Sequence, residues 1–218
     1  QTIRCCQSNT SRIQLNFALG LHPMFIDAHQ PHHLVELESL ARSSSAVAIG
    51  EIGLDFHPSA EPSKSQKEKQ RLYFEKQVVI AERLNLPIIV HIRKAHDDCL
   101  QILRQHSLKG GIIHAFNGSF AQGMKYAELG FLLGFGGMLT FTRSRKLQEL
   151  VKAIPIEHIA LETDAPDMVV EAHRGERNSP EYLPHVLRAV AQHKSQDIEF
   201  VAKQTTNNVS SLFGLTDP

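Results

Sequence analysis

Short apolar runs alternate along the chain with longer segments of helical periodicity. The apolar runs at 15–21, 47–54, 88–90, 112–113, 131–135 and 159–161 predict six strands. Apolar residues recur at helical spacing over 33–43, 64–86, 97–106, 119–129, 144–154, 180–193 and 197–213. No Asn-Gly hairpin joins two of the apolar runs, so the pattern favours β-α units with a parallel sheet.

This alternation is compatible with two α/β architectures. Six strands fit a doubly wound sheet, whereas a (β/α)8 barrel needs eight strands and usually about 250 residues. No internal repeat or linker divides the 218 residues, and 42% of them are apolar, enough for a sizeable core. We therefore expect a single domain over 1–218.

The stretch 46–56, AVAIGEIGLDF, combines an apolar run with two acids, Glu51 and Asp55. Burying a carboxylate is costly unless it is paired, hydrogen-bonded or bound to a metal. The stretch therefore predicts a buried strand whose last residues carry a functional carboxylate into a cleft.

Residues able to do chemistry follow almost every predicted strand. They are His22, Glu51, His91, His114 and the pair Glu162 and Asp164. The carboxyl ends of parallel strands lie on one side of a sheet, and in a barrel they converge on one mouth. Taken singly, each histidine also fits a surface position and each aspartate a helix N-cap. The joint pattern favours a site.

Histidine and carboxylate together favour a metal site. Neutral imidazole and carboxylate bind Zn²⁺, Mn²⁺ or Mg²⁺, and such a cation lowers the pKa of a bound water to about 7. The sequence has no G-x-S-x-G elbow, no P-loop and no G-x-G-x-x-G, and the glycines over 134–137 have the wrong spacing for one.

The net charge and the cysteine content exclude fewer classes of protein than the motifs do. Lys plus Arg and Asp plus Glu both number 23, so no global basic field signals strong non-specific nucleic-acid binding. Three cysteines, two of them adjacent, do not suggest a disulfide framework and suit a reducing compartment. No apolar run reaches the roughly 18 residues that span a membrane. We expect a cytoplasmic monomer without a membrane partner.

Five motifs together resemble the TatD family of metal-dependent hydrolases. They are GLHP (20–23), GEIGLDF (50–56), LPIIVHIR (86–93), IIHAFNGS (112–119) and LETDAPDM (161–168). They occur in the family's order and at similar spacing, and the resemblance runs from about residue 16 to residue 213. The APDM ending and GFGGMLTF (134–141) are most similar to the bacterial YjjV-type branch.

The resemblance implies a (β/α)8 barrel with one or two divalent metal ions that cleaves phosphodiester bonds in DNA. By motif, Glu51 resembles the bridging ligand, and His91 and His114 resemble its partners at one metal. Asp164 resembles a ligand of the other metal, and Asp164 is also expected to orient or deprotonate the attacking water. Glu51 and Asp164 are therefore the expected catalytic residues, and Asp55 becomes a loop or supporting acid.

Two further residues are expected to contact substrate. Arg93, beside His91, is placed to meet a phosphate, although a solvated loop arginine is the alternative. His22 is expected to line the pocket. RNSP (177–180) resembles a loop near the family's site.

The sequence departs from the family at its start. The family opens with a strand carrying His-x-His-x-Asp, which this sequence does not contain. We therefore expect a chain that lacks the first two strands of the barrel. Three functions stay open: a metal-dependent deoxyribonuclease, a barrel hydrolase of a small ester or amide, and a catalytically impaired scaffold.

Overall fold

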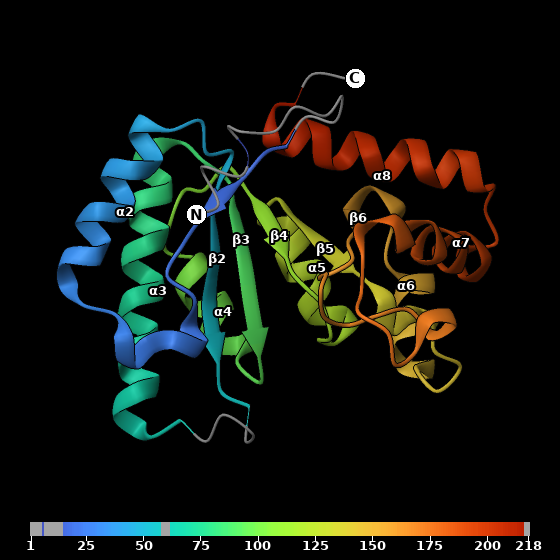
Figure 1. The fold of residues 1–218 in the computed structure, drawn as a ribbon, viewed down its shortest axis with the longest axis horizontal. Helices are drawn as coiled ribbons and strands as arrows, with labels where there is room; N and C mark the ends of the chain where they lie inside the picture. The colour runs from blue at the N-terminus through green and yellow to red at the C-terminus, as the bar shows by residue number, and fades with distance from the viewer. Residues whose placement is uncertain (1–5, 7–14, 58–61, 216–218) are drawn as a thin grey trace. The chain divides into compact units, whose positions relative to one another are not determined.

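The computed structural model describes residue 6 and residues 15–57 and 62–215. Helices and strands alternate through these residues, and the chain divides into two compact units, Gln1–Gly111 and Ile112–Pro218 (Figure 1).

The elements that the structure describes in the first unit are three strands, a 3-10 helix (η) and three α-helices. In chain order they are β1 (Ala18–Leu19), η1 (Pro23–Ala28), α2 (Pro31–Ser43), β2 (Ala48–Asp55), α3 (Lys64–Leu84), β3 (Ile88–Arg93) and α4 (His96–Leu103).

Strand β2 is the inner strand of this unit. It pairs in parallel with β1 on one side and with β3 on the other, with Ala18 opposite Ala48 and Gly53 opposite His91. Every residue of β2 is buried except Glu51, which is partly exposed. A strand buried on both faces reads as a nearly continuous apolar run, which is why the sequence pattern located it.

Helix α3 covers β2. Its N-terminus is a capping box, in which the Ser63 hydroxyl accepts from the Gln66 N–H and the Gln66 side chain accepts from the Ser63 N–H. Phe74 and Val78 lie on its buried face, and α2 lies alongside α3 (Figure 1). The helix ends at Leu84, because Asn85 adopts the left-handed conformation, and so does not extend to residue 86 as the periodicity predicted.

The second unit begins as the chain passes through β4 (Gly111–Ile113). It continues with α5 (Phe120–Glu128), β5 (Phe131–Phe135), η3 (Gly137–Thr140), α6 (Arg145–Ala153), η4 (Ile156–His158), β6 (Ile159–Leu161), η5 (Glu171–His173), η6 (Pro180–Tyr182), α7 (Leu183–Lys194) and α8 (Ile198–Phe213).

Aromatic side chains fill much of the core of this unit. Phe116 meets the rings of Tyr126 and Phe135 edge to face, and Tyr126 meets Phe131 in the same way. Strands β5 and β6 run parallel. The predicted parallel α/β fold is confirmed in both units.

Two details of the strand ends differ from the sequence prediction. Strand β2 continues to Asp55, which is fully buried and is not a loop residue. Glu51 accordingly lies in the middle of the strand and not at its end. The strand continues through the glycines near Glu51, as the predicted range 47–54 implied. In the described part of the chain, no helix is long and apolar enough to cross a membrane.

Candidate metal centre

Glu51 lies in a part of β2 whose backbone is in close contact with β3. Glu51 is flanked by Gly50 and, two residues on, by Gly53. Gly53 has a φ of +145°, and a Cβ atom there would overlap the carbonyl oxygen of His91. The glycine therefore allows β3 to approach β2 closely enough to bring His91 beside Glu51.

His22, Glu51 and His91 form a cluster in the first unit. Nδ1 of His91 lies 2.9 Å and Nε2 of His22 lies 3.4 Å from Oε1 of Glu51. The two rings meet edge to face with centroids 4.6 Å apart. One nitrogen or oxygen from each of the three residues lies within 4.8 Å of the others. Two imidazoles and a carboxylate are a donor set that suits a divalent transition metal.

The two histidines face this cluster differently. His22 Nδ1 accepts a hydrogen bond from the Met24 N–H at 3.2 Å. A neutral imidazole carries one proton, so this bond assigns the proton of neutral His22 to Nε2. His22 therefore meets the cluster as a hydrogen-bond donor. This suits contact with an anionic oxygen better than ligation of a metal.

His91 has a carboxylate at each ring nitrogen. Its Nε2 lies 3.2 Å from Oδ2 of Asp55, and its Nδ1 faces Glu51. When Asp55 accepts the Nε2 proton, Nδ1 keeps a lone pair for a metal ion. This is the carboxylate–histidine arrangement found behind many metal ligands.

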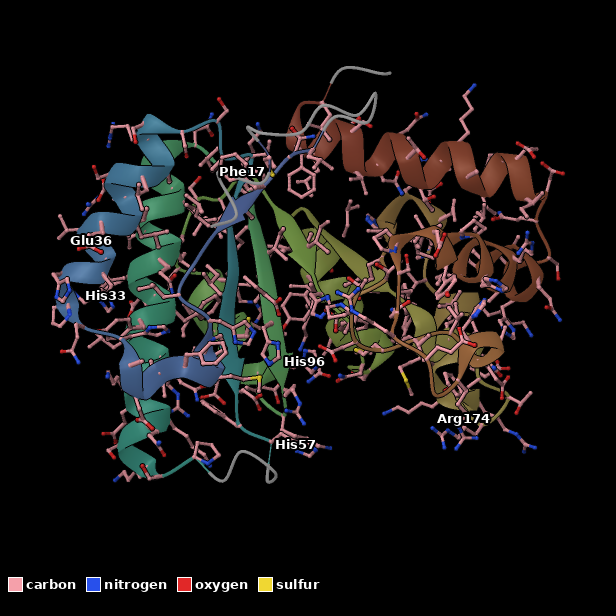
Figure 2. All side chains as sticks on the ribbon, viewed as in Figure 1. Phe17, His33, Glu36, His57, His96 and Arg174 are labelled. Atoms are coloured by element: carbon pink, nitrogen blue, oxygen red, sulfur yellow. The ribbon has the colours of Figure 1, made fainter. Side chains whose placement is uncertain are left out.

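Asp55 is held as an anion inside the protein. Burial raises its pKa, but the hydrogen bonds from the His57 N–H and His91, together with the Arg93 charge, outweigh burial and lower the pKa below its ordinary value. Arg93 donates to Oδ2 at 3.1 Å, and the His57 N–H donates to Oδ1 at 3.0 Å. Figure 2 shows His57 just past the end of β2. The predicted contact of Arg93 with substrate phosphate stays a prediction.

The second unit holds a separate group of polar residues. His114 follows β4, and Glu162 and Asp164 follow β6. Nδ1 of His114 lies 3.0 Å from Oε2 of Glu162, and its Nε2 lies 3.6 Å from Oδ1 of Asp164. Here too, one ring nitrogen meets a carboxylate and the other faces a second candidate ligand.

A tight turn fixes the backbone around Asp164. Asp164 has a φ of +57°, and its carbonyl oxygen accepts from the Asp167 N–H at 2.8 Å. The amide of Asn178, buried to 2% exposure, donates to the carbonyl oxygens of Thr163 and Asp167 on either side. The RNSP segment thus supports the turn that carries Asp164.

Residues 3–214 match the family described as TatD related DNase. The chain belongs to the TatD family. Its fold and metal-dependent hydrolase class follow from this membership, and the expected resemblance is confirmed.

Three relatives illustrate what this TatD-family chain is similar to. The metal-dependent hydrolase YabD of Bacillus subtilis is 37% identical over 90% of this chain and 76% of its own length. The 3′-5′ ssDNA/RNA exonuclease TatD of Klebsiella pneumoniae is 34% identical, again over 90% and 76%. The crystal structure of YjjV, a TatD homologue from Escherichia coli, superimposes with a TM-score of 0.90 and 30% identity, covering 99% of this chain and 82% of that one.

Of the two carboxylates behind the candidate ligand histidines, the sequence offered a supporting role for Asp55 but none for Glu162. Asp55 was expected as a loop or supporting acid, and Glu162 was noted at a strand end without a role. The positions Glu162 and Asp164 are two apart, as residues on one side of an extended chain are. That spacing was the available signal that both reach the same imidazole.

Proposed function

We propose that this chain is a deoxyribonuclease that hydrolyses phosphodiester bonds with one or two divalent metal ions. The observation that carries the proposal is the prepared ligand pair of β2 and β3. His91 Nδ1 lies 2.9 Å from Glu51, while buried Asp55 takes the other ring nitrogen. The Klebsiella relative, named a 3′-5′ ssDNA/RNA exonuclease, supports nucleic acid as the substrate.

Four residues are the proposed metal ligands: Glu51, His91, His114 and Asp164. Their chemistry suits Mg²⁺, Mn²⁺ or Zn²⁺. Glu51 and His91 belong to the first unit and His114 and Asp164 to the second, and the family's motifs carry their assignment as ligands.

A bound divalent cation supplies a water of lowered pKa and stabilises negative charge on phosphoryl oxygens. Proton transfer and contact with the phosphate fall to residues of the protein. Asp164 accepts the proton of the attacking water. His22, whose Nε2 carries the proton, donates to a phosphate oxygen, and Arg93 contacts a substrate phosphate.

Exposed cations in the second unit favour nucleic acid over a small ester or amide. Five exposed cations lie on the segments that follow β5 and β6, namely Arg143, Arg145, Lys146, Arg174 and Arg177. No ion pair involves them within the described residues. Figure 2 shows Arg174 on the loop after η5.

Hydrogen bonds hold these two segments together. The Thr142 N–H donates to the Glu171 carboxylate at 3.3 Å, and the Glu171 N–H donates to the Thr140 hydroxyl at 2.8 Å. A second acid, Glu176, is bonded to His173. Glu171 and Glu176 are thus both held by hydrogen bonds within these segments.

The activity is tested with Glu51→Gln on single-stranded DNA with added Mg²⁺ or Mn²⁺. The matched control is Glu36→Gln, the same change on the exposed side of α2 (Figure 2). We expect Glu51→Gln to lower the cleavage rate by at least about 100-fold and the control to leave it unchanged. Unchanged cleavage by Glu51→Gln would remove Glu51 from the mechanism.

Two further outcomes discriminate the alternative functions. If the wild type binds no metal in calorimetry and added Mn²⁺ or Zn²⁺ does not produce activity, the chain is an impaired scaffold. If it cleaves small esters but not DNA, it is a hydrolase of small substrates.

Arg143→Gln tests the contact with DNA. The logarithm of the binding constant for single-stranded DNA falls with the logarithm of the salt concentration, and this slope should become shallower by about 0.7 for each phosphate that Arg143 neutralises in the wild type.

A further inference from the structure

We propose that Glu162 is a positioning residue that fixes the ring and tautomer of His114, and that β5 carries glycine at 134 to make room for it. The consequence for metal binding rests on the proposed role of His114 as a ligand. The geometry of the pair stands independently of that role.

Each oxygen of the Glu162 carboxylate contacts a different neighbour. Oε2 lies 3.0 Å from Nδ1 of His114, and Oε1 accepts from the Ala115 N–H at 2.8 Å. One carboxylate thus holds both the ring and the backbone of consecutive residues. With 18% of its side chain exposed and 14% of that of His114, the pair is largely shielded from water.

This arrangement selects one tautomer of His114. An ionised carboxylate only accepts hydrogen bonds, so Nδ1 of His114 must donate. Nε2 is then the nitrogen with the lone pair, and it is the nitrogen that lies 3.6 Å from Asp164. A neutral imidazole binds a metal through the nitrogen that carries no proton.

The strand beside Glu162 lacks a side chain at the critical position. A Cβ atom at Gly134 would overlap Oε2 of Glu162 and lie 2.9 Å from its Cδ. Gly134 lies in β5, whose Phe135 carbonyl oxygen accepts from the Glu162 N–H. Its φ is outside the left-handed range, so space and not backbone conformation demands glycine here.

Gly136 provides the internal comparison. A Cβ atom there would lie 3.4 Å from Cγ of Glu162, close to ordinary contact. The two glycines are two residues apart, and both face Glu162. Only the first excludes a methyl group from the space of the carboxylate.

No single substitution at 162 can replace both hydrogen bonds. Glutamine has one oxygen, so its NH₂ group would face either the His114 Nδ1–H or the Ala115 N–H. Aspartate is one methylene shorter and cannot reach both partners.

The test uses the metal-free wild type, Glu162→Gln, Gly134→Ala and Gly136→Ala. Long-range ¹H–¹⁵N NMR of the neutral imidazoles reports the tautomer of His114, and calorimetry with Mn²⁺ alone reports the metal affinity. We expect the Nδ1–H form in the wild type and in Gly136→Ala. We expect mixed tautomers and an affinity lower by about 10- to 100-fold in Glu162→Gln and Gly134→Ala.

Each result decides the question. An Nε2–H tautomer in the wild type overturns the proposal without any variant, even if a variant fails to fold. Equal effects of Gly134→Ala and Gly136→Ala overturn the role of Gly134. Mixed tautomers without weaker Mn²⁺ binding overturn the positioning of a metal ligand. Because the tautomer is read without substrate, a wild type that fails to cleave DNA leaves this test intact.

Discussion

His91 in the first unit and His114 in the second are both oriented by a carboxylate, but in different surroundings. Asp55 behind His91 is 1% exposed and accepts from three groups, including the Arg93 guanidinium. Glu162 behind His114 is 18% exposed and accepts from two groups, neither of them an arginine or lysine.

The difference follows from burial. A fully buried carboxylate needs a charged partner and several donors to stay ionised, and Asp55 has them. A partly exposed carboxylate needs less compensation, and for Glu162 the main requirement is space. Substitutions in the first unit should therefore cost folding stability, whereas those in the second should act on the ligand's orientation.

The largest expected effect is that of Gly53→Ala. Alanine would be strained at a φ of +145° and would also overlap the carbonyl oxygen of His91. We expect the free energy of unfolding to fall by about 4 kcal/mol, since strain and overpacking each cost about 1–3 kcal/mol. Urea denaturation of the metal-free protein measures it.

Gly175→Ala is the matched control for that change. Gly175 has a φ of +92°, but nothing lies within 4 Å of a Cβ atom there. The decrease in stability should stay near 1 kcal/mol, the cost of the backbone conformation alone. Similar decreases in the two variants would show that contact with β3 does not matter.

The next effect in size is that of Asp55→Asn. The amide would turn an NH₂ group toward either Arg93 and His91 or the His57 N–H, leaving buried donors without an acceptor. We expect the free energy of unfolding to fall by about 3 kcal/mol in urea denaturation. For Glu162→Gln, whose side chain is partly exposed, it should fall by only about 1 kcal/mol. If the free energy of unfolding fell equally in both variants, the difference in burial would not explain the difference between the two regions.

Much of the fold could be predicted from the sequence, since short apolar runs and period-3.6 patterns report directly on burial. Strands β5 and β6 match their predicted bounds. Of the candidate ligands, the sequence correctly placed His114 just after a strand, whereas His91 lies inside β3, which continues beyond the predicted end at residue 90 to Arg93.

The supporting residues could not be predicted in the same way. The sequence left Asp55 as either a loop or a supporting acid, because no local pattern indicates the Arg93 and His91 contacts that make its burial possible. The use of Gly134 was equally hidden. Glycine is required at 134 because the carboxylate of Glu162, which follows β6, occupies the space of a side chain there. A local sequence pattern carries no information on such a distant contact.

The smallest effect is a pH dependence that isolates Asp55. Its pKa in the folded protein is lowered from an ordinary value of 3.8, so its contribution to stability is fully present above that value. The contribution is lost as the pH falls below 3.8 and through the folded pKa. The stability difference between wild type and Asp55→Asn should therefore be constant from neutral pH to about pH 5 and narrow below about pH 4. Both proteins share every other carboxylate, so subtracting their unfolding free energies removes those groups. A difference that stays constant down to the acid limit of folding would mean that Asp55 stabilises the first unit through packing alone.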